Sequence, residues 1–292
     1  MSTGLLRHDG PFWRGLATFG ASHAPRVLVR YTPPVWAFAF ALAMPKVRAR
    51  VRRNLRRVLG PRPARQELAD VFRTFAHFAS CLTEGLALGG PRPPPVDCVV
   101  EGGEHLARAI ERGRGAILVT AHTGGWEIAG PLLKKRYDLD VVIVMQRELD
   151  DDARRIQDGA RQRSGVKVVH VGHEPLAALP LVNHLRRGGA LGVQIDRVPD
   201  AMRALPVRLF GAGALVPSGP FQLARAAGSP VLPVFIRRLG YFRYEIRMGP
   251  AIEIPRAASP AVVSDAAQRA ASEMEAFIQA NPTHWFDFGR RA

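Results

Sequence analysis

The chain has 292 residues, of which 47% are hydrophobic and 23% are charged. This length allows one large domain or two modest ones, and it supports a hydrophobic core without disulfides. The composition excludes a disordered polymer, a collagen-like chain and a polytopic membrane protein. Lysine and arginine number 41 against 25 acidic residues, which gives a net charge of +16. Such an excess favours a polyanionic partner: nucleic acid, an anionic membrane surface or an acidic carrier protein.

The two cysteines, Cys81 and Cys98, have no C-x-x-C spacing and no cysteine or histidine companions at zinc-ligand intervals. We therefore expect no disulfide framework and no metal site, and a reducing compartment. No segment reaches the ~20 apolar residues that span a bilayer. The first residues also lack the unbroken apolar core of a signal peptide.

Residues 1–90 are predicted to form a helical segment that faces a membrane. Val35 to Met44 are apolar throughout, which is half a span and suits a buried or an interfacial helix. From Lys46 to Arg73 follow ten basic and two acidic side chains. Because each basic residue near an anionic surface adds ~1 kcal/mol of attraction, we expect an interfacial anchor here. A solvated basic helix face is the alternative.

The next segment predicts one long helix. From Ala64 to Leu86 apolar side chains recur at three- and four-residue steps, which indicates a single buried stripe. His77 lies beside that stripe and is expected to be structural. Residues 89–95, Gly-Gly-Pro-Arg-Pro-Pro-Pro, then end the helix and form a stiff linker.

Residues 91–292 predict an α/β domain with a mixed, mostly parallel central sheet flanked by helices, continuous with the helical segment. Apolar, β-branched runs alternate with amphipathic stretches, the pattern of a sheet covered on both faces. The expected strands are Cys98–Val100, Ala116–Ala121, Val141–Met145, Val166–Val171, Ala190–Ile195, Val207–Phe210, Val231–Ile236 and Tyr244–Met248. The expected helices are His105–Arg112, Trp126–Tyr137, Asp151–Ser164, Leu176–Arg187, Ser218–Ala227 and Val262–Ala280.

The sharpest local feature is a strand-to-helix junction. His122 follows the expected strand, Gly124 and Gly125 allow a tight turn, and Glu127 falls in the first turn of the next helix. Ligands of such sheets bind beyond the carboxyl ends of the strands. The turn can bring the Glu127 carboxylate back to the imidazole, where it would fix the tautomer and stabilise the imidazolium. Such a pair also arises by chance among nine histidines and 25 acidic residues, but the context favours a site.

Residues 122–127, His-Thr-Gly-Gly-Trp-Glu, resemble the H-x4-D/E signature of the lysophospholipid acyltransferase superfamily. Their ending is close to the H-F-G-N-W-E form of the late acyltransferases of bacterial lipid A biosynthesis, the lauroyl and myristoyl transferases. Thr123 and Gly125 replace the more usual Phe and Asn. The likeness runs from about Arg48 to Trp285, and further blocks follow in the family's order: Met145-Gln146-Arg147, Gln194-Ile195-Asp196-Arg197, Phe210-Gly211, Ser218-Gly219-Pro220, Val231-Leu232-Pro233 and His284-Trp285-Phe286.

The resemblance implies an O-acyltransferase in which His122, oriented by Glu127, takes the proton of an acceptor hydroxyl. The hydroxyl then attacks an acyl thioester of acyl carrier protein or coenzyme A, so no cofactor and no acyl-enzyme are needed. The implied acceptor is a glycolipid, first of all a lipid A precursor; another lipid acceptor (a lysophospholipid, glycolipid or aminolipid) is the alternative. The implied location is the cytoplasmic face of the bacterial inner membrane, with peripheral or monotopic attachment.

The same resemblance implies residues that bind the acceptor. Arg147 would hold an anionic group of the acceptor by a bidentate contact, with an ordinary surface ion pair as the alternative. Gln194 and Asp196, at the end of a later strand, would bind polar groups of the acceptor or fix Arg147. A helix cap or a loop position is the alternative for Asp196.

Other positions are expected to shape the site. The backbone N–H groups of Gly124 and Gly125, with Trp126 at the helix start, would bind the substrate and stabilise the oxyanion. Ser218 is expected mainly as a helix N-cap. Pro233 would mark an edge strand or a bulge, and the resemblance puts it near the acyl chain.

Three other functions are weighed against this one. A nucleic-acid-binding protein would explain the charge, but the arginine run lacks interleaved aromatics and a binding motif, so we expect no nucleic-acid partner. A serine hydrolase would need G-x-S-x-G, which does not occur. Dinucleotide binding is offered only by residues 211–216, which lack the third glycine of the fingerprint.

Overall fold

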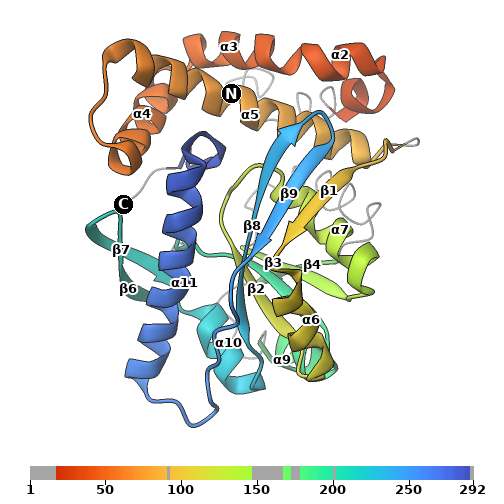
Figure 1. Cartoon of the computed structure of the whole chain (residues 1–292), viewed down its shortest axis with the longest axis vertical. Helices are drawn as coiled ribbons and strands as arrows, with labels where there is room; N and C mark the ends of the chain where they lie inside the picture. Colours follow the sequence, from red (N-terminus) through yellow and green to blue (C-terminus); the bar gives the residue numbers. More distant parts are fainter. Residues whose placement is uncertain (1–17, 91–92, 147–166, 172–177, 200–201, 290–292) are drawn as a thin grey trace, which may run out of the picture.

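The computed structural model describes residues 18–90, 93–146, 167–171, 178–199 and 202–289. Its centre is a seven-stranded sheet with strand order β1-β9-β8-β2-β5-β3-β4 (Figure 1). Neighbouring strands are parallel except for β8 and β9, which confirms the predicted mixed, mostly parallel sheet. The strands are β1 (Asp97–Glu101), β2 (Ala116–Thr120), β3 (Val141–Gln146), β4 (Lys167–Val171), β5 (Ala190–Gln194), β8 (Val231–Gly240) and β9 (Arg243–Met248).

Helices cover both faces of the sheet. On one face lie α6 (Gly103–Glu111) and α7 (Trp126–Tyr137), whose buried side chains join one apolar cluster. On the other lie α9 (Leu179–Arg186), α10 (Gly219–Ala227) and α11 (Pro260–Ala280), which join a second cluster. The expected helix over residues 151–164 lies outside the described residues.

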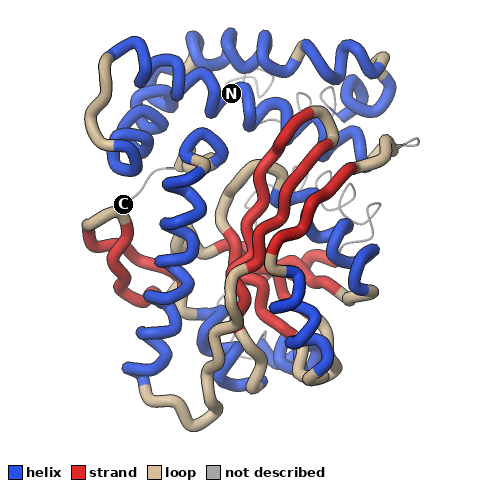
Figure 2. Tube along the Cα trace, in the orientation of Figure 1, coloured by secondary structure: helices blue, strands red, loops and turns tan. Residues whose placement is uncertain are grey.

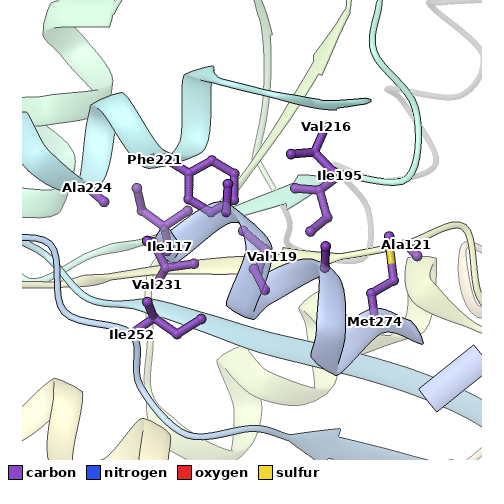
Figure 3. Packing of buried hydrophobic residues seen from close by; sticks show 14 of the residues in the cluster. Ile117, Val119, Ala121, Ile195, Val216, Phe221, Ala224, Val231, Ile252 and Met274 are labelled. Carbon is purple, nitrogen blue, oxygen red and sulfur yellow. The ribbon is translucent and has the colours of Figure 1, made fainter. Parts of the chain in front are cut away.

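The alternation of side chains along β2 fixes which residues face which layer. Ile117, Val119 and Ala121 pack toward α10 and α11, where Figure 3 shows them among Phe221 and Met274. Leu118 therefore faces α7, and Thr120 does the same, because successive side chains of a strand point to opposite faces. By the same rule the next residue on the α7 side is His122.

The structure adds an antiparallel hairpin, β6 (Ala204–Leu209) and β7 (Ala212–Pro217), of which only the first strand was expected in part. Phe210 and Gly211 have φ values of 53° and 73° and form its two-residue turn, the geometry that hairpins favour. The second strand was not predicted, because it begins with alanine and glycine, which have a low preference for strands. The segment that offered weak dinucleotide binding is this turn and strand.

Pro233 does not mark an edge strand, because β8 lies between β2 and β9. Residues 231–233 pair with β2, and pairing with β9 begins at Val234. The proline thus sits where β8 changes partners, a position at which a missing N–H breaks no continuous ladder. The outer half of β8 and β9 then projects beyond β2 toward the amino-terminal helices (Figure 2).

A helical layer crosses this end of the sheet (Figure 1). It comprises α2 (Arg26–Tyr31), α3 (Pro33–Ala43), α4 (Pro45–Leu59) and the predicted long helix, α5 (Ala64–Leu88). Ala37 and Ala41 pack against Val71 and Phe75, leaving the larger side chains of α3 exposed. None of the helices in the described part has the length and apolar character that crossing a bilayer requires. A membrane-facing role of this layer therefore stays a prediction.

Most arginines of the basic run have internal partners rather than forming a free charged face. Arg52 and Arg56 bind the buried Glu67, and Arg62 binds the buried Asp70. Arg56 and then Arg52 hold the pKa of Glu67 at about 2 through their hydrogen bonds, against the opposing effect of burial. Other arginines donate to backbone carbonyls of Ala41, Phe288 and Leu209. The run therefore ties α4 to α5 and to distant segments.

Candidate active site

A histidine–aspartate pair stands at the carboxyl edge of the sheet. His122 follows β2 and Asp196 follows β5, two parallel strands whose register aligns Thr120 with Gln194. His122 Nδ1 lies 2.8 Å from Asp196 Oδ1. The His122 side chain is 25% exposed, whereas that of Asp196 is fully buried. A carboxylate at Nδ1 fixes the tautomer that leaves Nε2 free to accept a proton.

The second oxygen of Asp196 is also engaged. Trp285 Nε1 donates to Asp196 Oδ2 at 3.0 Å, and both side chains are buried. Burial alone would raise the pKa of Asp196, but the charge and hydrogen bond of His122, nearby Arg197 and the Trp285 indole hold it well below its usual range. Asp196 therefore stays ionised at neutral pH.

This position differs from the expected one. The resemblance placed Asp196 on the rim as a residue that binds polar groups of the acceptor or fixes Arg147, with a helix cap or a loop position as the alternative. Instead it lies beneath His122, has no exposed side-chain surface, and uses both oxygens within the protein. It can orient the imidazole but cannot reach an acceptor.

Gly124 and Gly125 of the loop are required for two different reasons, backbone conformation and close packing. Gly125 has a φ of 90°, and a Cβ there would lie 2.4 Å from the Tyr244 ring. Gly124 has no such φ, but a Cβ there would lie 2.7 Å from the His284 ring. Only Gly125 is thus required by the turn, whereas both glycines are required by close packing against the rings of Tyr244 and His284.

The carboxyl-terminal segment fastens this loop. Thr123 forms an antiparallel bridge with Trp285, and Phe286 N donates to the His122 carbonyl at 2.7 Å. Arg197 donates to the Phe286 carbonyl and pairs with Asp287. Three segments distant in sequence therefore hold the imidazole and its carboxylate together.

Under the loop lies a second, wholly buried polar group. Glu84 of α5 accepts from Arg238 at 2.8 Å and from Tyr244, and it is 1% exposed. His284 stacks on His77 at 4.0 Å and contacts the Arg238 carbonyl. Burial, and then the charge of His77, lower the pKa of His284 to about 3, so His284 is neutral. Glu84 and Tyr244 are buried, and the cluster around them supports the loop.

An apolar pocket opens beside His122, between α7 and strands β2, β3, β5 and β8. Its volume is about 50 Å³, and it is partly open to solvent. Trp126 lines it and meets the His122 ring edge-on at 6.3 Å. The other lining residues are Leu118, Thr120, Ala129, Gly130, Leu133, Val141, Ile143, Val144, Gly192, Val193, Gln194, Val234 and Ile236.

The structure thus brings together His122, Asp196, Gln194 and Trp126, and it separates other expected site residues. The Glu127 side chain and all of Arg147 lie outside the described residues, so their roles stay predictions. Ser218 stands at the N-cap of α10 without a side-chain cap bond, in a buried position. Of the β8 residues, Val234 and Ile236 line the pocket, whereas Pro233 does not.

Sequence reasoning missed two residues in their observed roles. That Asp196 meets His122 depends on β5 lying next to β2, which no local pattern reveals. The signal available was that both residues directly follow predicted strands, Ala116–Ala121 and Ala190–Ile195. Trp285 carries no such signal, because its role depends on a chain return of 89 residues. No three His, Cys, Asp or Glu side chains of the described ranges group as metal ligands.

Comparisons with known proteins agree with the motif. The family model "Bacterial lipid A biosynthesis acyltransferase" matches residues 12–292. A phosphatidylinositol mannoside acyltransferase of Mycolicibacterium smegmatis is 28% identical over 193 residues, 63% of this chain and 61% of the relative. Its counterpart in Mycobacterium tuberculosis is 28% identical over 196 residues, 65% of this chain and 58% of the relative. The chain therefore spans about three fifths of these curated relatives and belongs to the bacterial lipid A biosynthesis acyltransferase family.

Proposed function

We propose that this protein is an O-acyltransferase that uses His122 as a general base. The observation that carries the proposal is the His122–Asp196 pair, because it joins a partly exposed imidazole to a buried carboxylate beside an apolar pocket. This arrangement suits a reaction in which a lipid hydroxyl loses its proton as it attacks. General-base help of this kind contributes ~10²–10⁴ in rate.

The reaction balances without a cofactor. Nε2 of His122 takes the hydroxyl proton while the oxygen attacks the thioester carbonyl, forming a C–O bond. The C–S bond then breaks, and the departing thiolate takes the proton back from the imidazolium. Asp196 stabilises that imidazolium throughout. The N–H groups of Gly124 and Gly125, at the start of α7, are our candidates for stabilising the oxyanion.

The proposed donor is an acyl thioester of acyl carrier protein or coenzyme A, and the proposed acceptor is a hydroxyl of a glycolipid. A glycolipid is common to the lipid A of the family's description and to the phosphatidylinositol mannoside in the relatives' names. A lipid A precursor is the first acceptor to test, and a phosphatidylinositol mannoside the second. Arg147 would bind an anionic group of either acceptor, and Glu127 would assist at the imidazole.

We propose further that the protein acts on the cytoplasmic face of a bacterial inner membrane. Support comes from α3, where Val35, Trp36 and Phe38 are exposed although the helix carries no charged residue. Exposed aromatic side chains of this kind suit the interface of a bilayer. Lys46 and Arg53 follow on α4, with no partner among the described residues, and would meet anionic headgroups.

The test uses purified protein, an acyl thioester and each glycolipid in detergent micelles, with products identified by mass spectrometry. We expect one added acyl chain on one of the two acceptors. His122→Ala should retain the circular dichroism spectrum of the wild-type protein and lose transfer by at least a hundredfold. Transfer at a near wild-type rate by the folded variant would refute the proposal.

A further inference from the structure

One side-chain nitrogen of the pocket lining has no hydrogen-bond partner among the described residues. Gln194 Nε2 has almost no exposed surface and hydrogen-bonds no described residue. A buried amide without a partner is costly, because the folded protein does not replace the hydrogen bonds that it makes in water. Such a group in a lining that is otherwise almost entirely apolar indicates a ligand that supplies the missing acceptor.

Its place along the strands shows which part of a ligand it would meet. The register aligns Thr120 with Gln194 and, one step deeper, Leu118 with Gly192. Below this row the lining is formed by Leu133, Val141 and other apolar residues. Gln194 lies two residues before Asp196, so the amide sits ~7 Å along the strand from the catalytic pair. The pocket is therefore polar at the end near His122 and apolar beyond it.

Gly192 leaves the room for that apolar part. A Cβ at Gly192 would meet only Ile143 Cγ1, at 3.9 Å, so the position borders open space and not packed backbone. The residues of α7 that line the same pocket include two small ones, Ala129 and Gly130. A fatty acyl group has the matching shape, because it is an apolar chain with one oxygen at its reactive end.

We infer that Gln194 binds the acyl donor, not the acceptor, and donates a hydrogen bond from Nε2 to the thioester carbonyl oxygen. The acyl chain then runs past Gly192 along the face of the sheet beneath α7. The inference rests on the proposed function. It changes the expected role of Gln194, which was to bind polar groups of the acceptor or to fix Arg147, and it assigns recognition of the donor's carbonyl group to this side chain.

The test measures binding rather than transfer, so that the two proposals fail separately. The probes are an acyl-coenzyme A thioester and its thioether analogue, in which a methylene replaces the carbonyl, titrated by calorimetry without acceptor. We expect wild-type protein to prefer the thioester by roughly tenfold, the size of one hydrogen bond to an otherwise unpaired buried donor. Gln194→Met, which is similar in size and apolar, should lose this preference and still bind the thioether.

Gly192→Leu is the matched variant, since it fills the apolar part and leaves the amide in place. It should weaken binding of both probes by a similar factor of at least tenfold. The inference is overturned if Gln194→Met keeps the preference for the thioester, or if Gly192→Leu binds both probes like the wild type. These results would leave transfer by His122 intact, whereas failure of wild-type protein to bind either probe, presented on coenzyme A and again on acyl carrier protein, would contradict the proposed function as well.

Discussion

The catalytic edge of the sheet and the amino-terminal helical layer depart from ordinary burial in opposite directions. At the edge, the charged Asp196 is withdrawn from solvent and satisfied by His122 and Trp285. In the layer, Trp36 is 62% exposed on a helix without charged residues. Both departures run against the usual pattern, in which apolar residues fill interiors and charged ones lie at the surface. Under the proposed function, the first departure serves proton transfer and the second serves contact with a membrane.

The largest effect is expected where the buried charge is removed. Asp196→Asn keeps the shape of the side chain, but its amide can donate to Nδ1 and so leave the proton on Nε2. Acyl transfer should fall by ~10²–10⁴ in kcat, with little change in the KM for the donor. Steady-state kinetics measure this. Asp140→Asn is the control. Asp140 directly precedes β3 and pairs with Lys167, so it lies at the amino ends of the parallel strands, whereas Asp196 lies at their carboxyl ends.

The exposed apolar side chains are the next target. Replacing Trp36 and Phe40 with serine should weaken binding to anionic vesicles by at least tenfold, since each large apolar side chain gains ~1.5–3 kcal/mol on leaving water. Flotation measures vesicle binding, and the thermal midpoint should stay unchanged. Val99→Ser and Leu215→Ser are matched controls on β1 and β7, at similar exposure. Loss of vesicle binding in these controls to the same extent would contradict an interface on α3.

The neutral His284 predicts a dependence of stability on pH. Its pKa is lowered to about 3 in the folded protein, whereas an unfolded histidine titrates near ~6.5. Between these values the unfolded chain binds more protons, so the free energy of unfolding falls as the pH drops below 6.5, by up to about 1.4 kcal/mol per pH unit. Urea denaturation at pH 7, 6 and 5 measures the slope.

His284→Gln should flatten that slope, although the variant is less stable at pH 7. His23→Gln is the control, because His23 is exposed near the start of the described chain. An equal slope in the wild type and in His284→Gln would contradict the assignment of the acid sensitivity to the ring beneath Gly124.

The smallest effects separate two kinds of basic residue in the run: those paired with a carboxylate and those with no partner among the described residues. Arg52 and Arg56 hold Glu67, so changing both to glutamine should lower the thermal midpoint and leave the salt dependence of vesicle binding nearly unchanged. Changing Lys46 and Arg53 to glutamine should do the reverse, weakening vesicle binding about fivefold per residue at low salt. Equal behaviour of the two double variants would remove the distinction.

Local patterns predicted the parts of this molecule that local interactions determine. The apolar run before His122 predicts β2, and the spacing from Ala64 predicts α5, because each depends on periodicity within the segment. The pairing of His122 with Asp196 depends instead on strand order, and the anchoring by Trp285 on a distant chain return. The sequence of the arginine run did not show that Arg52 and Arg56 are paired, because local spacing does not reveal a carboxylate, such as Glu67, on a neighbouring helix.

The central claim is that His122 transfers a proton and never carries the acyl group itself. The most direct measurement is a single turnover of purified protein with an equimolar acyl thioester and its glycolipid acceptor, followed by lipid analysis and intact-protein mass spectrometry. We predict that acceptor is acylated at a rate that His122→Ala lowers by at least a hundredfold, with no gain in protein mass. A covalently acylated protein that forms and decays during the turnover would contradict the account.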